Sequence, residues 1–138
     1  MNAIPLPNPH DPLTAPHWQA ARKEQIAMQR CPACGYVRWP AANSCPECLT
    51  EGGEWTALSG RGSIWSFAVY EKPLDPAFAE LCPYAVALIR LDEGPIIYAR
   101  MLDPPDRLAC EARVVAVHEH VTDAVSLARF KLESANAD

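Results

Sequence analysis

Two closely spaced cysteine pairs constrain the fold of this chain more than any other feature of its sequence. Cys31 and Cys34 form one C-x2-C pair, and Cys45 and Cys48 form a second after ten intervening residues. This spacing suits a tetrahedral metal site, because each C-x2-C loop presents both sulfurs to one ion at about 2.3 Å. We expect zinc, with iron as the alternative that rubredoxin-type loops also accept. Two disulfides or four unrelated thiols are the competing interpretations.

Sulfur would fill all four positions of this site, so no open position is left for a substrate or a water molecule. We therefore expect the metal to be structural. The two other cysteines, Cys82 and Cys110, are isolated in the sequence. A nucleophilic thiol needs a nearby base and an electropositive setting. We expect neither thiol to be catalytic, and a stand-alone enzyme that uses one of them is the alternative.

His118 and His120 stand two residues apart in a segment with a strand pattern, so their side chains share one face of that strand. The pair could bind a metal ion. The other interpretation is that this face is exposed to solvent, and we then expect Val115 and Val117 to point toward the core.

Charge and segment composition narrow the class of protein. The formal net charge is −5, from 12 basic and 17 acidic residues, which argues against a protein that binds the nucleic-acid backbone. No apolar run approaches the ~18 residues of a membrane helix. Residues 1–5 have neither the charged start nor the apolar region of a secretory signal. We therefore expect a cytoplasmic protein with reduced cysteines, bound to neither nucleic acid nor membrane.

The chain divides by composition into an arm, a cysteine module, a strand-rich part and a tail. Residues 1–16 hold five of the fourteen prolines and are expected to form an extended arm. Residues 17–54 contain a short helix, expected over about 15–25 with Thr14 as its N-cap, a short strand over 26–30, and the cysteines. Residues 55–133 are expected to form a barrel domain, and residues 134–138 a tail.

Five segments of the third part have the pattern of strands. They are residues 62–71, 84–91, 95–101, 113–121 and 126–132. In the first of them, strict alternation places Trp65, Phe67 and Val69 on one face and Ile64 on the other. Five strands in this order fit a small barrel of the OB type, and an SH3-like barrel fits almost as well.

Several motifs make the chain similar to a known family. They are, in order, H-W-Q-A at 17–20, R-C-P-A-C-G at 30–35, W-P at 39–40, C-P-E-C at 45–48, S-G-R-G-S-I-W-S-F at 59–67, P-Y-A-V-A-L-I-R-L-D-E-G at 83–94 and Phe130. With them, the chain resembles small proteins that join an N-terminal helix and a rubredoxin-like zinc ribbon to a C-terminal OB fold. The resemblance implies a mainly β fold in which a five-stranded OB-fold barrel follows the ribbon.

The resemblance also implies a role. Such proteins are non-catalytic accessory subunits of thiolase-superfamily enzymes or of hydratases that act on acyl-CoA. By this analogy the ribbon docks on a thiolase-like catalytic subunit, in a hetero-oligomer with two copies of each chain, and the barrel helps to bind acyl-CoA. The residues expected along the acyl-CoA path are Trp65, Phe67 and Tyr84, with Arg61 or Arg100 near its phosphates. A nucleic-acid-binding protein with a zinc ribbon and an OB fold is the alternative function.

Overall fold

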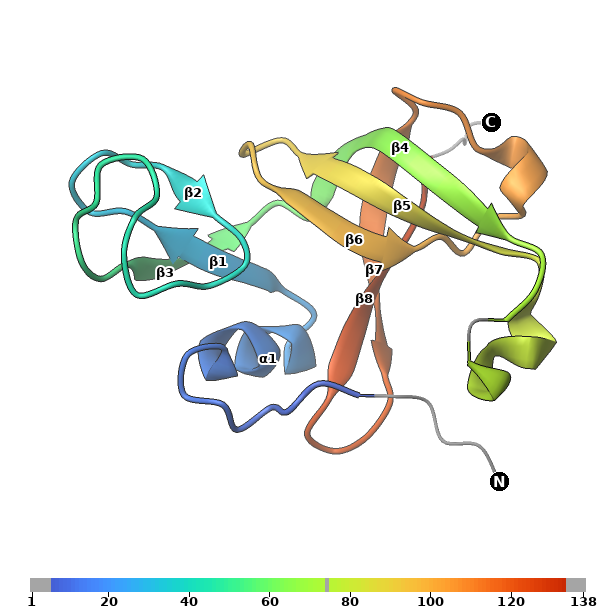
Figure 1. Ribbon diagram of the computed structural model, residues 1–138, viewed down its shortest axis with the longest axis horizontal. Helices are drawn as coiled ribbons and strands as arrows, with labels where there is room; N and C mark the ends of the chain where they lie inside the picture. Colours follow the sequence, from blue (N-terminus) through green and yellow to red (C-terminus); the bar gives the residue numbers. More distant parts are fainter. Residues whose placement is uncertain (1–5, 74, 134–138) are drawn as a thin grey trace.

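The computed structural model describes residues 6–73 and 75–133 (Figure 1). The predicted tail and the first five residues of the predicted arm lie outside this part. Residues 8–14 form consecutive turns that lead into helix α1 (Ala15–Arg22). Thr14 occupies the N-cap position, although its side chain donates and accepts no capping hydrogen bond. The helix ends three residues before the predicted position, because Glu24 adopts a φ of +61°, which α-helical geometry does not allow.

A three-stranded antiparallel sheet carries the cysteine loops. The central strand β1 (Ile26–Arg30) pairs with β2 (Val37–Arg38) on one side and with β3 (Glu54–Leu58) on the other. The short strand expected over residues 26–30 is thus present, whereas β2 and β3 are not among the predicted strands. The predicted division at residue 55 stays a prediction, since β3 is hydrogen-bonded to the ribbon strand β1 and leads directly into the first barrel strand.

The second sheet is a nearly closed antiparallel barrel with the strand order β6-β5-β4-β7-β8. Its strands are β4 (Arg61–Tyr70), β5 (Tyr84–Leu91), β6 (Ile96–Arg100), β7 (Arg113–His120) and β8 (Ser126–Leu132). The 3-10 turns η1 (Pro76–Leu81) and η2 (Pro105–Arg107) lie in the connections that follow β4 and β6. All five predicted strands are therefore confirmed, with ends that differ by at most one residue, and the barrel is OB-like.

The prediction of strict alternation along β4 is wrong. The register between β4 and β5 shifts between Ile64 and Ser66, which is the signature of a β-bulge at Trp65. Because the bulge inserts one extra residue, Ile64 and Phe67 both contact the core, while Trp65 is 47% exposed. Trp65 and Phe67, which were expected on one face, are therefore in different environments: Trp65 is exposed and Phe67 packs against the core.

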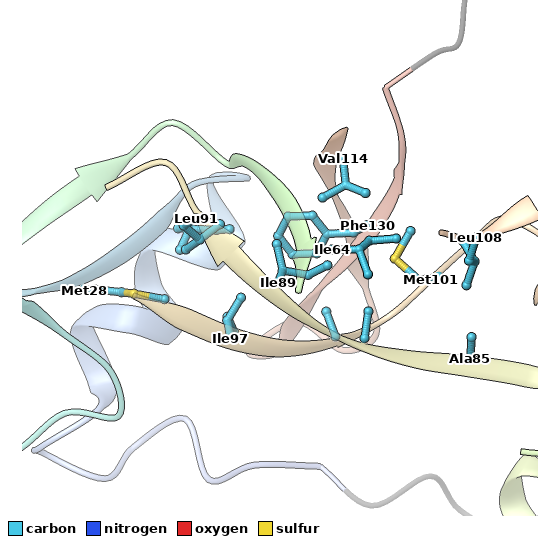
Figure 2. Packing of buried hydrophobic residues seen from close by; sticks show 13 residues of the cluster. Met28, Ile64, Ala85, Ile89, Leu91, Ile97, Met101, Leu108, Val114 and Phe130 are labelled. Carbon is cyan, nitrogen blue, oxygen red and sulfur yellow. The ribbon is translucent and has the colours of Figure 1, made fainter. Parts of the chain in front are cut away.

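One hydrophobic core spans the barrel and part of the ribbon. Phe130, Ile64, Ile89 and Val114 fill the barrel and are fully buried. Ile26 and Met28 of the ribbon strand β1 belong to the same cluster, and Figure 2 shows Met28 at its ribbon end. The ribbon and the barrel therefore share buried apolar surface instead of being joined by a linker alone.

Candidate functional site

The four cysteines of the two C-x2-C pairs converge on one point of the ribbon. Their sulfur atoms all lie within 4.8 Å of one another. The Sγ atoms of Cys31 and Cys48 are 3.6 Å apart, and those of Cys34 and Cys45 are 3.7 Å apart. A tetrahedral ion bound at about 2.3 Å from each sulfur requires sulfur–sulfur distances of about 3.8 Å. The side chains are therefore already positioned to bind one metal ion, as the sequence predicts.

Each cysteine pair sits in a loop of the same geometry. The N–H of Ala33 points at the Sγ of Cys31 at 3.4 Å, and the N–H of Glu47 points at the Sγ of Cys45 at the same distance. Both loops close with a left-handed residue after the second cysteine, which is Gly35 in one loop (φ +80°) and Leu49 in the other (φ +68°). Leu49 thus accepts a conformation that is costly for a residue with a Cβ atom.

Hydrogen bonds and crowding act in opposite directions on the four thiols. The hydroxyl and N–H groups of Thr50 lower the pKa of Cys48 to about 6. The N–H of Tyr36 favours the thiolate of Cys34, but desolvation and the three neighbouring sulfurs outweigh it and raise the pKa of Cys34 to about 12. Removing the last protons from such a cluster needs a compensating positive charge. A bound divalent cation supplies this charge.

A buried arginine supports the metal-binding loops from inside the ribbon. Arg38 is 3% exposed, and its Nε donates to the side-chain carbonyl of Gln29 at 2.9 Å. Its Nη2 donates to the backbone oxygens of Ala42 and Gly52 at 2.8 and 3.0 Å. Arg38 is not among the predicted site residues, because arginine is rarely buried and nothing in the local pattern marks this one.

The remaining thiols have no catalytic partners among the described residues. The Sγ of Cys82 contacts the backbone oxygen of Phe78 at 3.7 Å, and Cys110 is exposed without a side-chain hydrogen bond. No imidazole or carboxylate of the described chain is hydrogen-bonded to either sulfur. Within the same residues, the four ribbon cysteines are also the only group whose ligand atoms gather closely enough to hold a metal ion.

His118 and His120 have different environments from those expected. Val114 and Ala116 contact the core, so the inward face of β7 carries the even-numbered residues, and the expectation for Val115 and Val117 is wrong. The Nε2 atom of His118 is buried and has no hydrogen-bond partner in the part of the chain that the structure describes, and burial lowers the pKa of this residue. His120 lies farther out, with its Nδ1 atom 2.6 Å from the hydroxyl of Ser126 and its Nε2 atom 3.4 Å from Glu24.

The structure separates the five residues that were predicted along an acyl-CoA path. Arg61 forms an ion pair with Glu133 at 2.7 Å at the start of β4. Tyr70 at the other end of β4 pairs with Tyr84. Nine residues of strand span about 30 Å, so Arg61 and Tyr84 lie at opposite ends of the barrel sheet. Trp65 is exposed between them, with the guanidinium of Arg90 5.5 Å from its ring centroid.

Three of the five residues lie in neighbouring depressions of the barrel. Tyr84 and Arg100 line a depression of about 300 Å³, which we call the arginine pocket. Its other principal walls are Tyr70, Phe78, Tyr98 and Arg129. Phe67 lines a smaller depression of about 160 Å³ that shares Tyr70 and Tyr98 with the arginine pocket. Phe78, Tyr98 and Arg129 are not among the predicted site residues, since they lie on η1, β6 and β8, which are distant from one another in the sequence.

Among the described residues, no helix combines the length and the hydropathy that crossing a bilayer would require. The longest one, α1, has eight residues.

Two family models match the chain. Residues 18–52 match the model described as "ChsH2, rubredoxin-like zinc ribbon domain", and residues 55–119 match "ChsH2, C-terminal OB-fold domain". Together they cover the cysteine site and most of the barrel.

Curated relatives include a scaffold protein and enzyme subunits. A "DUF35 domain-containing scaffold protein" of Methanothermobacter thermautotrophicus is 34% identical over 104 residues, which are 74% of this chain and 77% of the relative. The "Benzoylsuccinyl-CoA thiolase subunit BbsA" of Thauera aromatica is 30% identical over 67% of this chain and 62% of its own. A "Probable enoyl-CoA hydratase alpha subunit" of Thermomonospora curvata is 32% identical over 71% of this chain, which spans only 30% of that protein's length.

A solved structure supports the same assignment. A chain of the "Ltp2-ChsH2(DUF35) aldolase" superposes with a TM-score of 0.81 at 29% identity, over 95% of this chain and all of that one. The three relatives reported above are thus a DUF35 scaffold protein and two subunits of enzymes that act on acyl-CoA. The zinc-ribbon geometry, the OB-like barrel and these matches show that the chain belongs to the DUF35 family, in which a ChsH2-type rubredoxin-like zinc ribbon precedes a C-terminal OB-fold domain.

Proposed function

We propose that this chain is a non-catalytic accessory subunit of a thiolase-type enzyme complex. The catalytic subunit would be a β-ketoacyl-CoA thiolase, a retro-aldolase or an acyltransferase, and this chain would dock on it and help to bind acyl-CoA. The observation that carries the proposal is the likeness, over 95% of this chain, to a chain of the Ltp2-ChsH2 aldolase.

The chemistry of the described residues supports a role without catalysis. Four sulfurs occupy every position of a tetrahedral site, so a bound metal keeps no position for a substrate. Cys82 and Cys110 lack the hydrogen-bonded base that would activate a thiol. The nucleophile and the acid–base groups would then belong to the partner.

The metal of the complex is proposed to be zinc, with iron as the alternative. Cys31, Cys34, Cys45 and Cys48 would hold it as thiolates. A bound ion would cross-link the two loops and neutralise their charge, and this would stabilise the ribbon.

The ribbon is the proposed docking surface for the catalytic subunit. Leu49 at the tip of the second cysteine loop is 78% exposed, and Tyr36 beside the first loop is 42% exposed. Exposed apolar side chains of this kind commonly mark a protein–protein contact. If the catalytic partner is a two-fold symmetric dimer, as most homo-oligomers are, each of its subunits would bind one copy of this chain.

The proposed acyl-CoA contacts are those expected from the resemblance. The two adjoining depressions support Phe67, Tyr84 and Arg100 as members of one binding region. Trp65 and Arg61 could contribute only from farther along the sheet, so their proposed role has weaker structural support.

Co-expression with a thiolase-like subunit tests this function. We expect the two chains to co-elute in size-exclusion chromatography and acyl-CoA turnover by the partner to rise when this chain is present. Leu49→Asp should abolish co-elution, because it places a charge in the proposed contact, while an aspartate tolerates the left-handed backbone. Leu102→Asp, on an exposed barrel residue, is the matched control and should leave co-elution intact. Equal turnover by the partner alone, together with failure to co-elute, would show the proposal to be wrong.

A further inference from the structure

The barrel is open along one seam, between β6 and β8. Among the described residues, the two strands are joined by a parallel bridge at Met101 and Phe130, where the N–H of Leu102 donates to the oxygen of Phe130 at 2.8 Å. The described parts of the two strands are not otherwise hydrogen-bonded neighbours in the sheet. The arginine pocket lies on the seam, since β6 contributes Arg100 and β8 contributes Arg129.

The charges of this pocket are not balanced. Arg129 donates from Nε to Glu119 at 3.0 Å, and the same carboxylate oxygen is 3.8 Å from Arg100. No hydrogen bond joins the side chain of Arg100 to any other residue that the structure describes, and within that part of the chain its buried Nε has no partner. Two guanidinium groups thus share one carboxylate. Burial and the charge of Arg129 both lower the pKa of Arg100, as expected for a cation that lacks a full counter-charge.

Aromatic rings form the rest of the pocket. Tyr70 and Tyr84 stack with centroids 5.2 Å apart and planes 8° from parallel, and Phe78 lies 5.9 Å from Tyr84. Tyr98 borders the pocket and is 74% exposed. No acidic residue of the described chain is among those that line this depression. Two guanidinium groups beside aromatic rings are complementary to a ligand that has an anionic group at one end and an apolar chain or a planar ring at the other.

We propose that the arginine pocket binds an organic oxyanion, in which Arg100 and Arg129 bind a phosphate or carboxylate and the tyrosine and phenylalanine rings contact the apolar part. The site lies within this chain alone, so binding does not require the catalytic subunit. The proposal rests on the proposed function, because Tyr84 and Arg100 belong to the acyl-CoA region proposed above, but its test uses this chain alone.

Calorimetry on the purified chain tests the site with three probes. Coenzyme A carries phosphates together with a planar adenine ring, and hexanoate carries a carboxylate on an apolar chain. Inorganic phosphate is the anion without an organic part. We expect coenzyme A or hexanoate to bind at least about tenfold more tightly than inorganic phosphate, because only the organic probes bury apolar surface against the rings. The probe that binds more tightly identifies whether the natural anion is a phosphate or a carboxylate.

Two substitutions with opposite effects separate this site from a purely structural one. Arg100→Met should weaken binding of the tighter probe by about tenfold or more, since it removes a charge-assisted contact while retaining an apolar side chain. Glu119→Gln should tighten binding, because among the described residues Glu119 is the only anion that is ion-paired with the two arginines. Arg90→Met, on the exposed cation above Trp65, is the matched control and should leave the affinity unchanged within about twofold.

Circular dichroism of each variant shows whether it is folded, so that a loss of binding by a folded variant can be attributed to the substituted side chain. The proposal is overturned if neither organic probe binds, if folded Arg100→Met and Arg90→Met variants have equal affinities, or if Glu119→Gln weakens binding. If the probes do not bind as expected but the two subunits still co-elute, the ligand site is refuted and the accessory role is not.

Discussion

The imidazole of His17 packs against the indole of Trp39, with ring centroids 4.1 Å apart and planes tilted by 30°. His17 belongs to α1 and Trp39 to the ribbon, so the contact attaches the helix to the metal-binding unit. The Nδ1 atom of His17 lies 2.8 Å from the backbone oxygen of Ala27. Because a carbonyl oxygen only accepts, Nδ1 must carry the proton. The buried ring is held in one tautomer between the helix and strand β1.

This burial predicts a pH dependence of stability. Desolvation lowers the pKa of His17, with a smaller contribution from His118, so the fold favours the neutral ring. Since the unfolded chain titrates near 6.5, the contribution of His17 is present above that pH and is lost as the pH falls below it. We expect the unfolding midpoint in urea to drop between pH 7.5 and 5.5.

Substitutions assign this effect to the buried ring. The drop should be smaller in His17→Asn, whose amide can still donate to Ala27, and unchanged in His10→Asn, where the histidine is exposed. Metal content must be measured at both pH values, because thiolate ligands also bind protons in acid. An equal drop in all three proteins would contradict the assignment.

The metal site predicts one zinc or iron ion per chain in freshly purified protein. Cys45→Ser should lower the metal content to well below one equivalent and reduce the melting temperature, because metal binding is coupled to folding of the ribbon. Cys110→Ser is the control, since its exposed thiol lies outside the cluster, and it should keep the full metal content. Elemental analysis and thermal denaturation measure the two effects. A full equivalent in the Cys45→Ser variant would show that the four sulfurs do not hold the ion together.

The shared core predicts that the ribbon and the barrel unfold together. Met28 is fully buried in the same cluster as the barrel residues Leu91 and Ile97. Met28→Ala should lower the free energy of unfolding by about 2–5 kcal/mol and shift the transitions of both parts equally. Three of the four tryptophans, Trp18, Trp39 and Trp55, belong to α1 or the ribbon, so tryptophan fluorescence reports mainly on that part, while far-ultraviolet circular dichroism reports mainly on the barrel strands. Two separate transitions in the variant, with the barrel unaffected, would mean that the two parts are independent.

Gly62 is required by a close approach of two strands. A Cβ atom at this position would overlap the backbone of Arg90 on β5. Gly62→Ala should therefore cost about 1–3 kcal/mol of unfolding free energy, because backbone cannot move aside as a side chain can. Ser66→Ala, on an exposed position of the same strand, should change stability by less than about 0.5 kcal/mol. Equal stabilities of the two variants in urea would refute the steric explanation.

The proposed accessory role predicts that the isolated thiols are dispensable. Cys82→Ala and Cys110→Ala should each leave acyl-CoA turnover by the assembled complex within about tenfold of the unsubstituted protein, the range of packing effects. A loss of a thousandfold or more in a folded single variant would instead assign catalysis to this chain.

Local sequence pattern was sufficient for the elements and the metal ligands. The barrel strands could be predicted because apolar runs and alternation are properties of adjacent residues, and turn-forming residues separate them. The four cysteines were identified for a similar reason, since a C-x2-C loop brings its two sulfurs together without help from the rest of the chain. Resemblance to a family, and not periodicity, distinguished the OB barrel from an SH3-like one.

The tertiary structure decided which side chains share a site. A single inserted residue at Trp65 reverses the inward and outward positions after it, and no local pattern announces such a bulge. Arg100 and Arg129 are 29 positions apart and meet because the curved sheet brings its two edge strands, β6 and β8, to the same seam. The sequence by itself thus determined the metal ligands and the five barrel strands, which depend on near neighbours along the chain, but not the ribbon strands β2 and β3. The arginine pocket and the core shared by ribbon and barrel arise from contacts between distant segments, which only the folded chain brings together.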